Sequence, residues 1–232
     1  SSSKSQNWLL PASILIAAVL ISGSLIYMTH QGGVAAPTQN QKDDSGVVKA
    51  EAPAAADRDV ILGNADAPIS IVEYEDFQCP FCAQYVSETE SQIRTAYVQT
   101  GKAKIVYRHL AFLGPESIAA AEASECAKDQ GKFWEYHDAL FAAEIADGKE
   151  HNGNLNRILF MKLAGDVKID TKAFGSCIDS KKYADHVAAQ TKEASDKYGV
   201  QSTPTIFVND QKIEGAYPFA TFQQVIDGIL NK

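Results

Sequence analysis

Two strand-like runs that enclose one helix-like segment set the strongest limit on how this chain can fold. Residues 69–75, ISIVEYE, are β-branched and aromatic and follow Pro68. Apolar residues then recur at three- and four-residue steps as far as Gly101, which predicts a helix. Residues 104–110, KIVYRHL, predict a second strand. The order strand, helix, strand is a βαβ unit, which favours parallel pairing of the two strands.

The remainder of the chain returns to strands only near its end. Four segments with helical spacing lie between residues 115 and 199, separated by glycine-containing breaks. TIFVN, a polar Asn209-Asp210 turn and then QKIEG predict a hairpin, and the apolar residues of 222–230 predict a closing helix. We therefore predict one α/β domain over residues 58–232, with a helical insertion over about 115–199.

The segment from Trp8 to Met28 carries no charged residue and is long enough to cross a bilayer core of roughly 30 Å as a helix. We predict a transmembrane anchor at residues 8–28. A cleaved signal peptide is the alternative, because small residues follow, but the apolar stretch is long for one. Lys4 favours a cytoplasmic tail at residues 1–7 and export of everything beyond the anchor.

Residues 29–57 are rich in Gly, Ala, Pro, Gln and Asp and almost free of large apolar side chains, so we predict a flexible linker there. The chain of 232 residues has a formal net charge of −8 and no basic cluster. Binding to nucleic acid phosphates relies on grouped Lys and Arg, so nucleic acid partners are not expected.

The motif CPFC at residues 79–82 falls where the first strand gives way to the helix. Cys79 is expected at the N-terminal edge of that helix, with Pro80 at an early helical position. Free backbone N–H groups and the helix dipole favour a thiolate there, so Cys79 is the predicted nucleophile. Cys82, one turn further and facing the core, is the predicted resolving partner. A zinc site is the metal alternative, but Cys126 and Cys177 stand alone, so no metal is expected.

Glu73 is a second candidate for the site. If Ile69 and Ile71 face one side of the sheet, alternation places Glu73 on the same apolar side. A buried acid has a raised pKa, so Glu73 is a candidate to exchange protons with Cys82. The alternative is that Glu73 reaches solvent at the end of the strand.

CPFC after a strand, the segment Thr203-Pro204-Thr205 ahead of a hairpin, and the helical insertion between them resemble the thioredoxin superfamily. Within it, the chain is most similar to the DsbA family of extracytoplasmic thiol-disulfide oxidoreductases. The resemblance covers roughly residues 58–232 and also includes ILGNADAPI, Phe133-Trp134 and GVQSTPTIFVN. It implies a thioredoxin-like fold with a helical insertion, here preceded by a single N-terminal transmembrane helix.

The resemblance also assigns site residues by position. Pro204 matches the family's cis-proline beside the active disulfide, Thr203 the residue before it, and Glu73 the buried acid. Phe81 stands where the best-known family member has His, which leaves the strength of oxidation and the substrate choice open. Some relatives carry a pair comparable to Cys126 and Cys177, which we expect to form a structural disulfide; two free buried thiols are the alternative.

The function implied is a membrane-anchored enzyme that introduces disulfide bonds into exported proteins by exchange at Cys79 and Cys82. Its partners would be unfolded exported proteins with reduced cysteines and a DsbB- or VKOR-like membrane reoxidant. We expect a single-pass cell membrane protein, a monomer, with its domain on the extracytoplasmic (periplasmic or extracellular) face and no cofactor. A disulfide reductase or isomerase, or a non-enzymatic tethered peptide-binding module, is the alternative.

Overall fold

The computed structural model describes residues 46–56 and 58–231. The predicted tail at 1–7, the predicted anchor at 8–28 and the first part of the predicted linker lie outside these residues. Within the described ranges, the helices are too short or too polar for any of them to cross a membrane.

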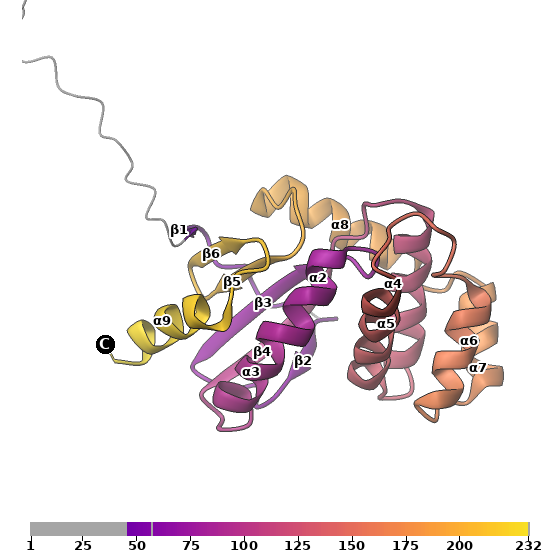
Figure 1. The fold of residues 1–232 in the computed structure, drawn as a ribbon, viewed down its shortest axis with the longest axis horizontal. Coiled ribbons are helices and arrows are strands. Elements are labelled where there is room, and N and C mark those ends of the chain that lie inside the picture. The colour runs from indigo at the N-terminus through magenta and orange to yellow at the C-terminus, as the bar shows by residue number, and fades with distance from the viewer. Residues whose placement is uncertain (1–45, 57, 232) are drawn as a thin grey trace, which may run out of the picture. The chain divides into compact units, whose positions relative to one another are not determined.

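A six-stranded mixed sheet forms the centre of the domain (Figure 1). Its strand order is β1-β6-β5-β3-β4-β2. The strands are β1 (Val47–Lys49), β2 (Val60–Leu62), β3 (Ile69–Glu75), β4 (Ala103–His109), β5 (Thr205–Val208) and β6 (Gln211–Glu214). Strand β3 pairs in parallel with β4, and β5 pairs antiparallel with both β3 and β6. The predicted βαβ unit and the predicted hairpin are therefore both confirmed.

One continuous helical segment follows β3 and leads into β4. It consists of α2 (Pro80–Tyr85), a π-helical turn at Val86–Glu90, α3 (Ser91–Ile93) and a second π-helical turn at Arg94–Val98. π-Helical turns are rare and frequently lie at functional sites. Here the first of them carries an acidic side chain, Glu90, into the protein interior.

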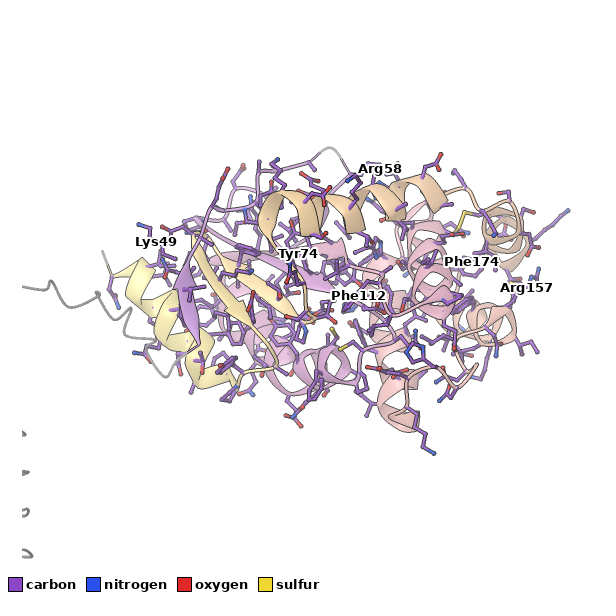
Figure 2. The ribbon with its side chains drawn as sticks, turned by 90° about the horizontal axis from the view of Figure 1, so that it is seen from above. Lys49, Arg58, Tyr74, Phe112, Arg157 and Phe174 are labelled. Atoms are coloured by element: carbon purple, nitrogen blue, oxygen red, sulfur yellow. A yellow bond between two sulfur atoms is a disulfide. The ribbon has the colours of Figure 1, made fainter. Side chains whose placement is uncertain are left out.

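Helices cover both faces of the sheet (Figure 1). On one face, Ile69 and Ile71 of β3 pack against α2, α3 and α9 (Phe219–Leu230). On the other, Tyr74 packs against Tyr198 of α8 (Ala184–Tyr198), with ring centroids 6.3 Å apart (Figure 2). Alternation along β3 therefore sends its odd-numbered residues to the face that α2 covers.

The insertion between β4 and β5 is helical, as predicted. It consists of α4 (Pro115–Lys128), α5 (Phe133–Asp147), α6 (Arg157–Asp166), α7 (Thr171–Asp179) and α8. Helices α4 to α7 form a group beside the sheet (Figure 1), and Phe174 of α7 is buried within it against Tyr136 of α5 (Figure 2). A disulfide between Cys126 of α4 and Cys177 of α7 joins two helices of this group, with Cα atoms 5.9 Å apart.

The predicted linker differs from the structure over its last residues. Residues 47–49 form the edge strand β1, which pairs antiparallel with residues 211–213 of β6. Further on, the carbonyl of Ala54 accepts a hydrogen bond from the buried Arg108. This part of the chain is therefore not a free tether. Its backbone binds to the domain through hydrogen bonds, which composition alone does not reveal.

Candidate active site

The turn between β3 and α2 is fixed by the buried side chain of Asp76. Its Oδ1 accepts from the backbone N–H of Gln78 at 2.9 Å, and its Oδ2 accepts from the N–H groups of Phe112 and Leu113 at 3.0 and 3.1 Å. The carbonyl of Asp76 accepts from the N–H of Cys79 at 3.0 Å. These bonds place Cys79 at the N-cap of α2, with Pro80 as the first helical residue, as predicted.

The Cys79 thiol is almost buried and is held in a setting that favours its ionisation. Its pKa falls to about 7, because hydrogen bonding from Cys82, and then from Thr203 and the backbone N–H groups of Cys82 and Phe81, outweighs the effect of burial. Its Sγ lies 3.5 Å from the carbonyl oxygen of Thr203. The N–H groups at the start of α2 thus act on the sulfur as the sequence predicts.

Cys82 differs sharply from its partner. It is fully buried, and burial, followed by the presence of Cys79 and the charge of Glu75, raises its pKa well above the usual value of a thiol. Both cysteines are free thiols in this structure, so it represents the reduced form. The asymmetry gives the two sulfurs the chemistry expected of an attacking and a resolving thiol.

A groove runs beside Cys79 and brings together the other residues expected at the site. The peptide bond between Thr203 and Pro204 is cis, as the resemblance implies. The groove has a volume of about 350 Å³ and is lined by Phe81, Gln84, Ser202, Thr203, Glu214, Gly215 and Ala216. The Phe81 side chain is 63% exposed at its edge. An extended peptide could therefore lie along this groove with a sulfur close to Cys79.

Glu73 is buried on the same face of the sheet as Ile69 and Ile71, where alternation predicts it. Its Oε1 accepts a hydrogen bond of 2.7 Å from the hydroxyl of Tyr85. Burial, and then the charges of Glu90 and Glu75, raise its pKa well above the usual value. The acid whose charge raises the pKa of Cys82, however, is Glu75, two residues further along β3. The predicted proton exchange between Glu73 and Cys82 stays a prediction.

Sequence reasoning missed the buried polar cluster around Glu75. Oxygens of Glu73, Glu75 and Glu90 lie within 4.8 Å of one another. Each acid already has its own partner: Tyr85 for Glu73, Arg94 at 2.7 Å for Glu90, and His137 at 3.7 Å for Glu75. These partners account for the cluster without a metal. The period of two along β3 could have indicated Glu75, but the approach of α5 was not visible in the sequence.

The pKa values in this cluster follow from burial and neighbouring charge. Burial raises the pKa of Glu75 to about 7, although its contact with His137 acts in the opposite direction. Burial lowers the pKa of His137, but its hydrogen bond to Asp138, its contact with Glu75 and the charge of Glu90 outweigh burial and raise that pKa to about 9. Near neutral pH, Glu75 is therefore partly ionised beside a protonated His137.

Comparisons with known proteins agree with this geometry. The thioredoxin family model matches residues 55–228. Disulfide bond formation protein D of Bacillus subtilis is 29% identical over 171 residues, which cover 73% of this chain and 74% of that protein. The crystal structure of Wolbachia pipientis alpha-DsbA1 is 26% identical with a TM-score of 0.67, and the match covers 75% of this chain and 92% of that one.

The same region also occurs in much longer proteins. It is 34% identical over 174 residues to Na(+)/H(+) antiporter NhaA 3 of Salinispora tropica, a match that covers 74% of this chain and 25% of that protein. The chain thus spans about a quarter of the length of the first curated relatives that it matches. A sheet with a CxxC helix start beside a cis-proline, together with the matching family model, places this chain in the thioredoxin family. Within that family it is similar to DsbA-like thiol-disulfide oxidoreductases.

Proposed function

We propose that this protein introduces disulfide bonds into exported proteins by dithiol-disulfide exchange at Cys79 and Cys82. The observation that carries the proposal is the difference between the two thiols. The pKa of Cys79, whose sulfur lies 3.5 Å from the carbonyl of the groove residue Thr203, falls to about 7, whereas the fully buried Cys82 stays protonated. A stabilised thiolate at Cys79 favours the reduced form of the pair, which makes the oxidised form an oxidant.

Oxidation of a substrate begins with the disulfide between Cys79 and Cys82 closed. A substrate thiolate attacks the Cys79 sulfur, and Cys82 leaves as a thiolate that takes up a proton. A second substrate thiolate then attacks the substrate sulfur of the mixed disulfide. Cys79 leaves as a thiolate stabilised by the start of α2, and the substrate departs with a new disulfide.

The reduced pair must then be reoxidised. We assign this step to a membrane partner of the DsbB or VKOR type, which would accept two electrons through a mixed disulfide with Cys79. The exposed edge at Phe81 and the adjoining groove offer the same surface to a substrate and to this partner. The two would then bind in turn.

The proposed location is the extracytoplasmic face of the cell membrane, with residues 8–28 as the anchor. The uncharged stretch of the sequence supports an anchor. The disulfide between Cys126 and Cys177 supports an oxidising compartment, because such bonds persist outside the cytosol. In this arrangement, exported chains would meet the site as they emerge unfolded.

A second candidate function, the reduction of disulfides, is favoured by the pKa of Cys79. A value of about 7 lies near that of thioredoxin, about 7, and well above that of DsbA, about 3.5. The Phe81 ring cannot supply the charge or hydrogen bond that a histidine would give to the thiolate. The pair would then be a milder oxidant than DsbA.

The reduction potential of the pair decides between oxidase and reductase. We expect a value between about −120 mV, typical of DsbA, and about −270 mV, typical of thioredoxin, with transfer from the oxidised protein to a reduced, unfolded two-cysteine substrate. A value at or below that of thioredoxin would assign the protein as a reductase. If oxidised protein transfers no disulfide while Cys79→Ala binds the substrate as well as the wild type does, the protein is a binding module.

A further inference from the structure

Glu75 immediately precedes Asp76, whose carbonyl accepts a hydrogen bond from the N–H of Cys79, and its charge raises the pKa of Cys82. It is fully buried, and within the described part of the chain neither of its carboxylate oxygens has a hydrogen-bond partner. Glu73 and Glu90 differ, because Tyr85 and Arg94 bond directly to one oxygen of each. Burial of an ionised carboxylate without such a bond destabilises the fold unless the carboxylate takes up a proton or pairs with a positive charge.

The group that faces Glu75 is His137 of α5. Its Nε2 lies 3.7 Å from Oε2 of Glu75, and its Nδ1 lies 2.8 Å from Oδ1 of Asp138. The rings of Phe77, Tyr107 and Phe141 surround the imidazole, with centroids 5.8, 5.2 and 4.8 Å away. Phe77 and Tyr107 belong to the same core cluster as Cys79 and Cys82. These rings leave His137 with two polar neighbours, Glu75 toward the core and Asp138 toward the surface.

Asp138 forms the outer end of this chain of groups. Its side chain is 49% exposed and accepts two hydrogen bonds of 2.9 Å from Arg94. Both residues line a surface pocket of about 230 Å³, together with Phe141 and Val86. A polar path therefore runs from the buried carboxylate of Glu75 through an imidazole to a carboxylate in contact with solvent.

We propose that Glu75 takes the proton of Cys82 when the active-site disulfide closes, and that His137 at the same time releases a proton to solvent through Asp138. The inference rests on the proposed exchange function and assigns Glu75 as the base that deprotonates Cys82. On closing, Cys82 loses its proton to Glu75 and attacks Cys79 in the mixed disulfide. The bond between Cys79 and the partner sulfur breaks, and the partner leaves as a thiolate.

The step balances in protons, electrons and charge. The Cys82 thiolate supplies the electron pair of the new bond to Cys79, and the electron pair of the broken bond leaves with the partner sulfur, so Cys82 is oxidised and the partner sulfur is reduced. Glu75 becomes neutral as it gains a proton, and His137 becomes neutral as its Nδ1 proton passes to Asp138 and then to water. The buried cluster therefore keeps its net charge. When the disulfide opens again, Glu75 returns its proton to Cys82 and His137 is recharged from solvent.

Several other titratable groups share this interior and bear on its pH dependence. Those that face Glu75 and His137 are Glu73 on β3, Tyr107 on β4, Cys79 and Cys82 at α2, Glu90 and Arg94 in the π-helical turns, and Asp138 on α5. Glu73 and Glu90 raise the pKa of their neighbours by charge, but each is already engaged by its own donor. Glu75 alone among the three acids faces His137.

The test follows the closing step by itself. A mixed disulfide is made between Cys79 and 5-thio-2-nitrobenzoate, and the release of the coloured thiol by Cys82 is recorded from pH 5 to 10. In the wild type, the rate should rise as Glu75 ionises and level off above a pH of about 7. In Glu75→Gln, closing at pH 7 should be on the order of 100-fold slower, the usual contribution of a general base, and should still rise at pH 10.

Matched variants separate the proton route from packing. His137→Gln should slow closing at neutral pH at least about tenfold. It should also move the plateau to higher pH, because His137 would no longer offset the rise in the pKa of Glu75 that burial causes. His109→Gln is the control, because His109 is also buried beside Phe77 and Tyr107 but faces Glu125 instead. It should close at a rate within about twofold of the wild type.

A wild-type rate and profile in Glu75→Gln, or equal slowing in His137→Gln and His109→Gln, would overturn the proposal. If the variants of the buried residues do not fold, Asp138→Asn replaces them in the test, because it alters only a half-exposed side chain. It should also slow closing at neutral pH. A failure of the proposed function would give a different result from a failure of the proton route. In that case the wild type would not transfer its disulfide to a protein substrate, even though it releases the coloured thiol with the predicted pH profile.

Discussion

Replacement of Cys79 by serine should abolish disulfide transfer, with a loss of at least roughly 1,000-fold in rate, because the attacking and accepting sulfur is removed. Cys82 cannot take its place. It is fully buried, and its pKa is raised well above that of an ordinary thiol. The measurement is the initial rate of oxidation of a reduced two-cysteine substrate, with circular dichroism to show that the variant is folded.

Cys82→Ser is the matched partner of this variant. It retains the reactive Cys79 but lacks the resolving thiol, so a mixed disulfide between Cys79 and the substrate should accumulate. Mass spectrometry after acid quenching detects this species directly. If Cys79→Ser rather than Cys82→Ser trapped the substrate, the roles assigned to the two sulfurs would be reversed.

Removal of the disulfide between Cys126 and Cys177 should produce the largest loss of stability. The bond closes a loop with a sequence separation of 51. The chain-entropy relation gives a loss of about 4 kcal/mol in the free energy of unfolding for a loop of this length, or a fall in Tm on the order of 10 °C. Cys126→Ala with Cys177→Ala is the suitable variant, because Cys126 is packed among buried alanines of α4 and the variant leaves no free thiol.

Urea unfolding of the variant and the wild type, both with Cys79 and Cys82 oxidised, measures this difference. Disulfide transfer should remain within about twofold of the wild type when the variant is folded, since the bond lies within the helical insertion and away from the groove. A change in the free energy of unfolding below about 1 kcal/mol would show that the bond does not constrain the unfolded chain.

Local patterns were sufficient to predict the central elements of the fold. Strand β3 coincides with the predicted run, and β4 is displaced from its predicted position by one residue, because both contain dense β-branched and aromatic residues that alternate between two packed faces. The hairpin of β5 and β6 follows from a polar turn between apolar runs. The same period of two along β3 placed Glu73 in the interior.

Features that depend on contacts distant in the sequence were not predicted. Strand β1 has only three residues, and its pairing with β6 joins segments more than 150 residues apart. The contact between Glu75 and His137 arises because α5 packs against α2, an arrangement that helical periodicity alone does not specify. His137 is buried among aromatic rings and also faces a buried acid, and neither contact can be read from the sequence around it.

The most direct measurement of the central claim is the titration of Cys79 by its ultraviolet thiolate absorbance in the reduced protein, with Cys82→Ser to isolate the signal. The serine hydroxyl in Cys82→Ser can replace the hydrogen bond that Cys82 gives to the sulfur, so together with the start of α2 and Thr203 it should hold the midpoint well below the ordinary thiol value of 9.0, at about 7. The reduced wild type should show one thiolate near pH 7 and no second one below pH 9. A single midpoint near 9 in both proteins would contradict the proposed exchange chemistry.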